Sequence, residues 1–390
     1  MEGKGHTVET LYLNSEPEAE CLERIFSVAD EFDVIGLQVF AHNRACTFRV
    51  LERYPDRRVV IGGIHASTMY PGIIEKYRNV VAVIGEGEVT FAELVERGAG
   101  PDVNGIAYWD GERVARTPDR ELIADLDTLP IPKHELFFSG GRTNANILTS
   151  RGCPYKCSFC TLDTTSRRKV RLRSPDSVIA EILHLKEICP DLMGIWIHDD
   201  SFLLDNARAI EICKRIAALK LGIALSCSAR FKPLSAEVVG ALESAGFVQV
   251  LFGLESGSEK ILKAAHKGIT RLDAMRAFEL FRDSPIAVTA FLIVGLPGED
   301  ETTIRETVEF IHQLQKIKYT YYEDIGTLIV YPGTEVYEIC KQAGAMTDDF
   351  WMTDEPVPLF TVEHPAEKLE GFKNAILDRI ALKRQLRHTA

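Results

Sequence analysis

The sequence has no long apolar run and no excess of basic residues. No stretch approaches the roughly 20 apolar residues of a membrane span, and residues 1–14 lack the pattern of a secretory signal peptide. The formal net charge is −12, which argues against a large nucleic-acid-binding surface. The nine cysteines are mostly scattered and odd in number, so they do not form a disulfide framework. We therefore expect a cytoplasmic protein with no membrane span and no nucleic-acid partner.

The first part of the chain, to about residue 98, alternates short apolar runs with helical patterns. Such alternation predicts an α/β fold with a parallel sheet. The turn Asp110-Gly111 predicts a hairpin over 104–117, and Pro130 and Pro132 favour a domain boundary in 125–133. The expected strands are 7–13, 33–40, 58–62 and 80–84, and the expected helices lie near 17–30, 44–53 and 70–77.

From residue 146 to about 334 the alternation resumes with longer helices. Ser174, Pro175 and Asp176 provide an N-cap, a first-turn proline and an acidic first turn, which together predict a helix start. Nearly six strand–helix steps predict a partial (β/α) barrel, whose functional residues follow the carboxyl ends of the strands. The expected strands are 147–150, 194–198, 224–228, 248–254, 287–294 and 324–330, and the expected helices are 175–188, 205–219, 236–245, 271–282, 302–315 and 366–385.

Three cysteines lie close together in the run Arg151-Gly-Cys-Pro-Tyr-Lys-Cys-Ser-Phe-Cys160. Zinc prefers four ligands, usually as two separated pairs, and no second Cys or His pair lies nearby in the sequence. The C-x₃-C-x₂-C spacing of Cys153, Cys157 and Cys160 therefore favours an iron–sulfur cluster with one iron left open for a substrate or cofactor. The other six cysteines have no ligand spacing, and we expect most of them to be buried apolar residues. They are residues 21, 46, 189, 213, 227 and 340.

This cysteine loop resembles that of the radical S-adenosylmethionine superfamily, with the aromatic Phe159 before the last cysteine. The resemblance implies a 4Fe–4S cluster whose open iron is chelated by S-adenosylmethionine. It also implies reductive cleavage of that cofactor to a 5′-deoxyadenosyl radical, with an electron from an external flavodoxin- or ferredoxin-type donor. Phe159 would lie near the adenine. The cofactor supplies the radical chemistry, and the protein supplies orientation and a dry site.

Two motifs on the following strands extend the resemblance. His198-Asp-Asp-Ser-Phe202 resembles a second-strand motif in which acidic groups, here Asp199 and Asp200, meet the ammonium of the cofactor. A helix N-cap is the alternative for these aspartates. Arg230 lies where relatives place an arginine against the methionyl carboxylate, and a surface salt bridge is the alternative.

Motifs on two further strands carry the resemblance to about residue 340. Gly253-Leu-Glu-Ser-Gly-Ser258 resembles the fourth-strand signature, which implies that Glu255 and Ser256 face the sugar or amino-acid part of the cofactor. The run 291–299 resembles the fifth-strand motif near adenine, which implies backbone approach at Ile293 and Gly295. The glutamate comes one residue late in that motif, so we expect Glu299 only to favour the next helix N-terminus. Tyr331-Pro-Gly-Thr334 is expected to be a structural turn.

The N-terminal part resembles the cobalamin-binding module fused to a large radical S-adenosylmethionine subgroup. The resemblance rests on residues 33–38, 61–66 and 84–88, and implies that Gly62 and Gly63 allow close approach to a corrin ring. The lower-ligand motif D-x-H-x-x-G is absent, so His65 is not expected to bind cobalt. Residues 1–6 look like the end of the first helix of the module, so its first strand is missing from the sequence and we expect weak cobalamin binding.

The fold predicted from these resemblances is a Rossmann- or flavodoxin-like cobalamin-binding-type sheet without its first strand, followed by a partial (β/α)₆ TIM-type barrel. The predicted domains are a truncated cobalamin-binding-like domain (1–125), a linker (126–140), a radical S-adenosylmethionine barrel (141–344) and a helical tail (345–390).

The function implied is radical S-adenosylmethionine chemistry on a small-molecule or peptide substrate. With cobalamin, the precedent is methylation of an unactivated carbon or phosphorus centre. One alternative is radical rearrangement, cyclisation or oxidation without methyl transfer. Another is a non-catalytic iron–sulfur electron-transfer protein, against which the open iron and the later motifs argue. A methylthiotransferase acting on transfer RNA would carry a second cysteine triad and a basic tail domain, and the sequence has neither.

Overall fold

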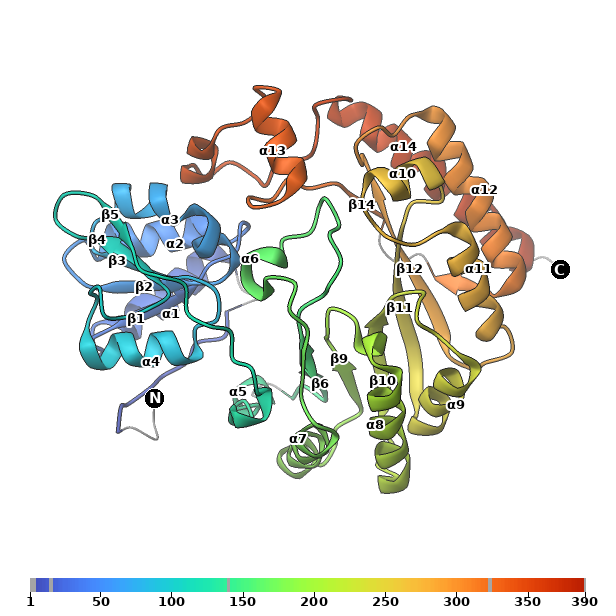
Figure 1. Cartoon of the computed structure of the whole chain (residues 1–390), viewed down its shortest axis with the longest axis horizontal. Helices are drawn as coiled ribbons and strands as arrows, with labels where there is room; N and C mark the ends of the chain where they lie inside the picture. The colour runs from blue at the N-terminus through green and yellow to red at the C-terminus, as the bar shows by residue number, and fades with distance from the viewer. Residues whose placement is uncertain (1–4, 14–16, 139–140, 322–324, 389–390) are drawn as a thin grey trace. The chain divides into compact units, whose positions relative to one another are not determined.

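The computed structural model describes residues 5–13, 17–138, 141–321 and 325–388, which Figure 1 traces along the chain. The chain forms two compact units. Unit 1 comprises residues 1–124, 161–167 and 330–358, and unit 2 comprises residues 125–160, 168–329 and 359–390. In the described part of the chain, no helix combines the length and the apolar character that crossing a membrane requires.

The sheet of unit 1 has the order β1-β2-β3-β4-β5 and is mixed. The predicted parallel pairing holds for the first three strands, and the predicted hairpin β4–β5 extends the sheet in antiparallel fashion. In the turn, Asp110 Oδ1 accepts hydrogen bonds of 2.9 Å from the N–H groups of Glu112 and Arg113. The strands are β1 (Ile35–Gln38), β2 (Val59–Gly62), β3 (Val80–Val83), β4 (Ile106–Trp109) and β5 (Val114–Arg116).

The strand predicted at 7–13 does not form. Residues 5–13 have no strand structure, and Val8 and Tyr12 are 41% and 37% exposed. A strand needs a hydrogen-bonded neighbour, and among the described residues β1 pairs only with β2. The prediction was therefore wrong, because an apolar run indicates a strand without supplying its partner.

The helices of unit 1 confirm two predictions and correct a third. Helices α1 (Glu18–Ala29) and α2 (Arg44–Arg53) lie where expected, whereas α3 (Ile64–Lys76) begins well before residue 70. The early start follows from Gly63, whose φ of +98° turns the chain directly from β2 into the helix. Helix α4 (Glu88–Arg97) was not predicted.

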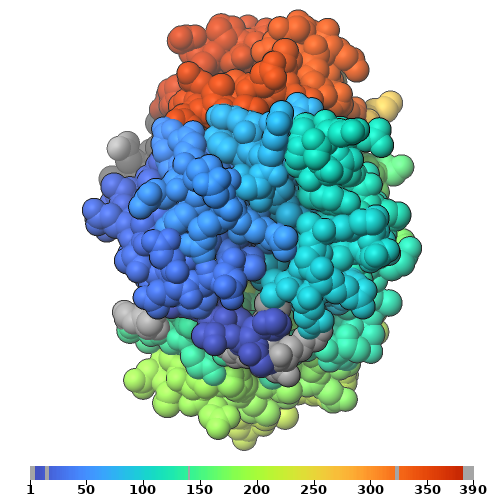
Figure 2. Space-filling view, turned by 90° about the vertical axis from the view of Figure 1, so that its left-hand side faces the viewer, coloured from blue at the N-terminus to red at the C-terminus, as the bar shows by residue number. Residues whose placement is uncertain are grey.

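The segment 330–358 belongs to unit 1, and its orange atoms cover one end of the blue and cyan module in Figure 2. It contains α13 (Glu335–Gln342) and the short 3₁₀ helix η4 (Asp348–Met352). Thr334 caps α13 by accepting the N–H of Tyr337, which confirms the turn predicted at 331–334. Trp351 is fully buried and its ring lies 5.3 Å from that of His65.

Unit 2 contains the predicted partial barrel. Its parallel sheet has the order β13-β12-β11-β10-β9-β6, and β14 also pairs with β12. The strands are β6 (Asn144–Ile147), β9 (Gly194–Ile197), β10 (Ala224–Ala229), β11 (Phe247–Glu255), β12 (Ala287–Val294), β13 (Thr320–Tyr321) and β14 (Ile325–Thr327). The strand predicted at 324–330 corresponds to β14, and Asp324 lies outside the described residues.

The helices of unit 2 begin at the predicted caps. Ser174 accepts the N–H of Ser177 at the start of α7, and Thr270 and Asp273 form a reciprocal capping box on α11. The helices are α5 (Glu135–Phe138), α7 (Pro175–Ile188), α8 (Asn206–Leu219), α9 (Ala236–Ala245), α10 (Glu259–Ala264), α11 (Arg271–Leu280), α12 (Glu301–Ile317) and α14 (Ala366–His388). The short α10 was not predicted.

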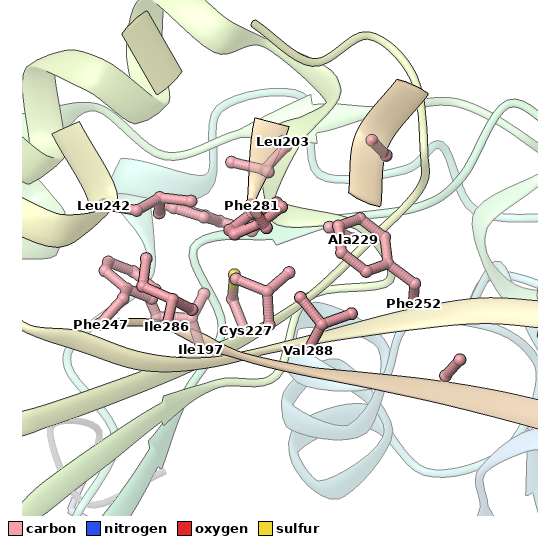
Figure 3. Packing of buried hydrophobic residues seen from close by; sticks show 14 of the residues in the cluster. Ile197, Leu203, Cys227, Ala229, Leu242, Phe247, Phe252, Phe281, Ile286 and Val288 are labelled. Atoms are coloured by element: carbon pink, nitrogen blue, oxygen red, sulfur yellow. The ribbon is translucent and has the colours of Figure 1, made fainter. Parts of the chain in front are cut away.

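The core of unit 2 lies between the strands and these helices. Figure 3 shows Ile197 of β9, Cys227 of β10, Phe252 of β11 and Val288 of β12 gathered with Phe281. Five of the six scattered cysteines are buried, as predicted, and Cys46 is partly exposed. Burial holds the pKa of the Cys227 thiol well above its usual value, so this cysteine is a core residue.

Candidate active site

The cysteine loop begins where the first barrel strand ends. The strand runs from Asn144 to Ile147, three residues before the predicted 147–150, and Ser150–Arg151 form the separate short strand β7, paired with β8 (Arg171–Leu172). Cys153, Cys157 and Cys160 follow as partly exposed free thiols. Among the described residues, no three Cys, His, Asp or Glu side chains converge as a metal site does.

The surroundings of the thiols fit an iron–sulfur cluster, because positive groups approach the sulfurs. The Nη1 atom of Arg230 lies 4.0 Å from Cys157 Sγ. Burial raises the pKa of Cys153, while the N–H of Tyr155 and the Arg230 guanidinium act in the opposite direction. Cluster ligands are thiolates, and these donors stabilise the thiolate form. Cysteines at this spacing would hold three irons and leave one open.

Asp199 connects the ends of two strands. Its carboxylate accepts four hydrogen bonds of 2.6–3.1 Å, from the N–H and hydroxyl groups of Thr149 and Ser150. These contacts shift the chain out of β6 and explain why the strand ends at Ile147. They also occupy the buried carboxylate, so the geometry favours a positioning role over the predicted cofactor contact.

Asp200 differs from its neighbour because its side chain is exposed. It accepts one hydrogen bond of 2.9 Å from the N–H of Gly152, immediately before the first cysteine. Desolvation against the surrounding protein atoms, and secondly the Asp199 charge, raise the pKa of Asp200. Of the two predicted aspartates, Asp200 is therefore the one with a carboxylate still available beside the cysteine loop.

Arg230 is a buried cation at the end of β10. Its guanidinium donates to the carbonyl of Lys267, lies 3.6 Å from the ring centroid of Tyr155, and leaves Nε without a hydrogen-bond partner. Within the described ranges, no carboxylate lies at ion-pair distance from it. The surface salt bridge considered from the sequence is therefore not formed, and the orphaned donor is consistent with an anionic ligand.

Glu255 and Ser256 end β11 but turn toward different neighbours. Glu255 is buried with a φ of +64°, and its Oε1 lies 2.6 Å from Nζ of the buried Lys267. Ser256 Oγ lies 3.2 Å from the hydroxyl of Thr307 on α12. The structure thus brings Glu255 beside Arg230 through Lys267, whereas Ser256 is hydrogen-bonded to a helix.

The fifth-strand motif forms a tight turn after β12. Gly295 has a φ of +90°, and its N–H donates a 2.6 Å hydrogen bond to Glu299 Oε2. Glu299 is buried, and burial raises its pKa to about 7. It precedes the N-cap Asp300 of α12, so the expectation that it only favours the helix N-terminus missed its contact with Gly295. Ile293 is half-buried on β12.

Phe159 joins the cysteine loop to Lys267, whose Nζ lies 6.0 Å from the ring centroid. The sequence reasoning did not identify Lys267. It lies in the segment Ala265–Gly268 that follows α10, and a lysine in a loop gives no sequence signal of burial. The carbonyl of Ala265 accepts the N–H of Ser158, so this segment supports the cysteine loop directly.

In unit 1, the predicted cobalamin residues lie at the end of β2. A Cβ on Gly62 would lie 3.9 Å from Val83, whereas one on Gly63 would lie 2.9 Å from the Val39 carbonyl. Gly63 is therefore required by the turn itself. Neither ring nitrogen of the buried His65 has a partner, and burial lowers its pKa to about 3. Its ring packs against Trp351 in the core, as expected of a residue that does not bind cobalt.

Comparisons with known proteins agree with both units. A model of the radical SAM superfamily matches residues 147–311, and a model of the B12 binding domain matches residues 1–95. An uncharacterized methyltransferase of Pyrococcus horikoshii is 30% identical over 337 residues, which cover 83% of this chain and 71% of that protein.

Two further relatives differ in how much of them the chain covers. The anaerobic magnesium-protoporphyrin IX monomethyl ester cyclase of Rubrivivax gelatinosus is 30% identical over 274 residues, 65% of this chain and 48% of that protein. The chain thus spans about half the length of the cyclase. The structure of the radical S-adenosylmethionine methyltransferase TsrM of Kitasatospora setae, with cobalamin and a 4Fe–4S cluster bound, has the same fold. Its TM-score is 0.72 at 22% identity, covering 88% of this chain and 73% of TsrM.

These matches confirm the predicted superfamily and the cobalamin-type module. The cofactors of the two matched domains are the predicted ones, a 4Fe–4S cluster with S-adenosylmethionine and cobalamin. The individual cofactor-binding residues stay predictions. The chain belongs to the radical S-adenosylmethionine superfamily, in the group of enzymes that carry a B12-binding domain ahead of the radical domain.

Proposed function

We propose that this chain is a cobalamin-dependent radical S-adenosylmethionine methyltransferase that acts on an unactivated carbon or phosphorus centre. The observation that carries the proposal is the presence of both cofactor domains on one chain, shared with a relative named as a methyltransferase. When bound, the cluster and S-adenosylmethionine supply a carbon radical, and cobalamin supplies a carrier for the methyl group.

The residues of unit 2 would hold the radical cofactors. Cys153, Cys157 and Cys160 would bind the cluster, and Arg230 would meet the methionyl carboxylate, since its Nε has no partner in the protein. Asp200 would accept the ammonium group, because the Asp199 carboxylate is occupied by four hydrogen bonds.

The remaining predicted residues would fix the orientation of S-adenosylmethionine. Phe159 and Ile293 would contact the adenine, with close backbone approach at Gly295. Glu255 would face the sugar or amino-acid part, held in place by Lys267. Exclusion of water from these contacts would protect the radical.

The proposal extends to the surroundings of the enzyme. We place it in the cytoplasm, where its nine free cysteines stay reduced. An acidic protein of net charge −12 would act on a small molecule or peptide and not on nucleic acid. A one-electron donor of the flavodoxin or ferredoxin type would reduce the cluster.

The experiment uses S-adenosylmethionine itself and needs no known substrate. Protein reconstituted anaerobically with iron and sulfide is incubated with S-adenosylmethionine and dithionite, with and without hydroxocobalamin. A methyltransferase of this type should form S-adenosylhomocysteine only with cobalamin, because the methyl group must leave S-adenosylmethionine for the corrinoid. Deoxyadenosine alone, unchanged by cobalamin, would contradict methyl transfer.

A matched variant tests the corrinoid site. Gly62→Ala introduces a Cβ only into ordinary contact with Val83, so the fold should persist while close approach of a corrin is blocked. We expect less bound corrinoid, measured by absorbance, at unchanged thermal stability. Wild-type binding in this variant would remove Gly62 from the site. The same assay on the wild-type chain tests the expectation of weak cobalamin binding.

The second candidate is radical ring closure without methyl transfer. The observation that favours it is the similarity to the Rubrivivax cyclase, which equals that of the Pyrococcus protein in identity but covers less of both chains. It predicts deoxyadenosine formation coupled to substrate, with no S-adenosylhomocysteine.

A further inference from the structure

Three buried charged side chains next to the cysteine loop do not balance. Arg230, Glu255 and Lys267 are 7%, 7% and 6% exposed. Lys267 Nζ and Glu255 Oε1 form an ion pair of 2.6 Å. Arg230 pairs with no carboxylate in the part of the chain that the structure describes, so the group keeps one excess positive charge. A buried uncompensated charge is costly, which calls for an anionic neighbour.

The position of this group identifies that neighbour as the cluster site. The guanidinium of Arg230 lies 4.0 Å from Cys157 Sγ and donates to the carbonyl of Lys267. The Lys267 ammonium lies 6.0 Å from the ring centroid of Phe159, the residue before the last cysteine. An iron–sulfur cluster on three thiolates is net negative in both oxidation states and becomes more so on reduction.

The ion pair is built into the backbone and is not a mobile surface contact. Glu255 has a positive φ of +64°, which is rare for a residue with a side chain. Its carboxylate folds back over Gly253, where a Cβ would lie 2.5 Å from Oε1 and 2.6 Å from Lys267 Nζ. Gly253 therefore leaves the only room for the pair, and the pair fixes where its opposite charges lie.

We propose that Lys267 is a positioning residue that sets the reduction potential of the cluster together with Arg230. Lys267 neutralises the Glu255 carboxylate, so the Arg230 charge acts unopposed beside Cys157. In a buried site of low dielectric, an unopposed cation favours addition of an electron to the neighbouring group. One electron from an external reductant enters the cluster, and no proton or covalent bond is involved. This inference rests on cluster binding and not on methyl transfer.

The test changes the buried charge one unit at a time. The cluster is titrated with dithionite, at fixed pH and without cobalamin or S-adenosylmethionine, and followed by electron paramagnetic resonance. Lys267→Met removes one positive charge and should shift the midpoint potential to lower values. Glu255→Gln removes one negative charge and should shift it to higher values. The double variant restores the wild-type net charge and should return to near the wild-type potential, and Lys267→Arg should keep it.

Iron and sulfide content identifies variants that fail to assemble the cluster. Loss of the cluster in Lys267→Met with its recovery in the double variant supports the charge balance, because only the single variant leaves Glu255 unpaired. Loss in both would overturn the proposal, since Lys267 would then be needed for packing. Unchanged potentials, or shifts of one sign in both single variants, would also overturn it. A failure of methyl transfer in the wild type would leave these results untouched.

Discussion

Two groups of buried charged residues lie at the carboxyl ends of neighbouring strands in unit 2, and they differ in how well they are satisfied. At the end of β9, the Asp199 carboxylate accepts four hydrogen bonds from Thr149 and Ser150. At the end of β10, Arg230 keeps its Nε unpartnered. Buried polar groups are normally paired, so the first group is complete within the chain and the second is not. The contrast separates residues that hold the barrel together from residues arranged for a ligand.

The largest effect is expected at the thiols that lie between these two groups. The triple variant Cys153→Ala, Cys157→Ala, Cys160→Ala should lose the cluster and all deoxyadenosine formation, because thiolates are the only protein ligands of the predicted cluster. Iron and sulfide content after anaerobic reconstitution, about four of each in the wild type, measures the loss. Cys46→Ala, at a partly exposed cysteine without ligand spacing, is the control and should keep a full cluster. Retention of a full cluster in the triple variant would refute the assignment.

The next effect sharpens the comparison on the satisfied side. Asp199→Ala would orphan two buried backbone N–H groups and two hydroxyls, which should lower the free energy of unfolding by about 3–5 kcal/mol. Chemical denaturation of the apoprotein measures it. Asp200→Ala, at the exposed neighbour with one hydrogen bond, should change stability by less than about 0.5 kcal/mol and instead weaken S-adenosylmethionine binding. Equal losses of stability in the two variants would erase the distinction.

On the unsatisfied side, the expected effect is on binding. Arg230→Ala or Glu255→Ala should weaken S-adenosylmethionine binding by roughly tenfold to hundredfold, since a hydrogen bond to a charged group contributes about 1.5–3 kcal/mol. Iron content should stay near normal. Equilibrium dialysis of the reconstituted variants measures the affinity. Arg215→Ala, which removes only surface ion pairs, is the control. Wild-type affinity in both test variants would make these residues structural.

The sequence predicted the barrel well because its signals are local. Ser174, Thr270 and the apolar strands specify caps and periodicity within a few residues of one another. The partners of buried charged groups could not be predicted in this way. Lys267 lies 12 residues after Glu255 in the chain, and its ion pair depends on a positive φ and on the space above Gly253. The same reason explains the wrong strand at 7–13, whose formation depends on a neighbouring strand and not on its own residues.

Asp199 and Arg230 mark the extremes, and Glu299 tests an intermediate case. Glu299 is as deeply buried as Asp199, yet among the described residues the only hydrogen bond to its carboxylate comes from the Gly295 N–H. Its pKa is raised to about 7, first by burial and then by Asp300 and Glu363, against the effect of the Gly295 N–H. One donor does not compensate for burial of the charge, so the folded protein favours the protonated form of Glu299.

The smallest predicted effect is therefore a pH dependence of stability. Because the pKa of Glu299 is higher in the folded than in the unfolded state, its contribution is fully present below the unfolded value, near 4.5, and is lost as the pH rises through about 7. Between pH 6 and 8 the free energy of unfolding should fall by about 1 kcal/mol. Glu299→Gln keeps an acceptor for the Gly295 N–H without the charge, and should remove this slope. Glu301→Gln, at an exposed residue whose pKa is lowered by hydrogen bonding to Lys368, should keep the slope. If the wild type and Glu299→Gln have the same pH profile in urea unfolding, one backbone donor satisfies this carboxylate as fully as four donors satisfy Asp199.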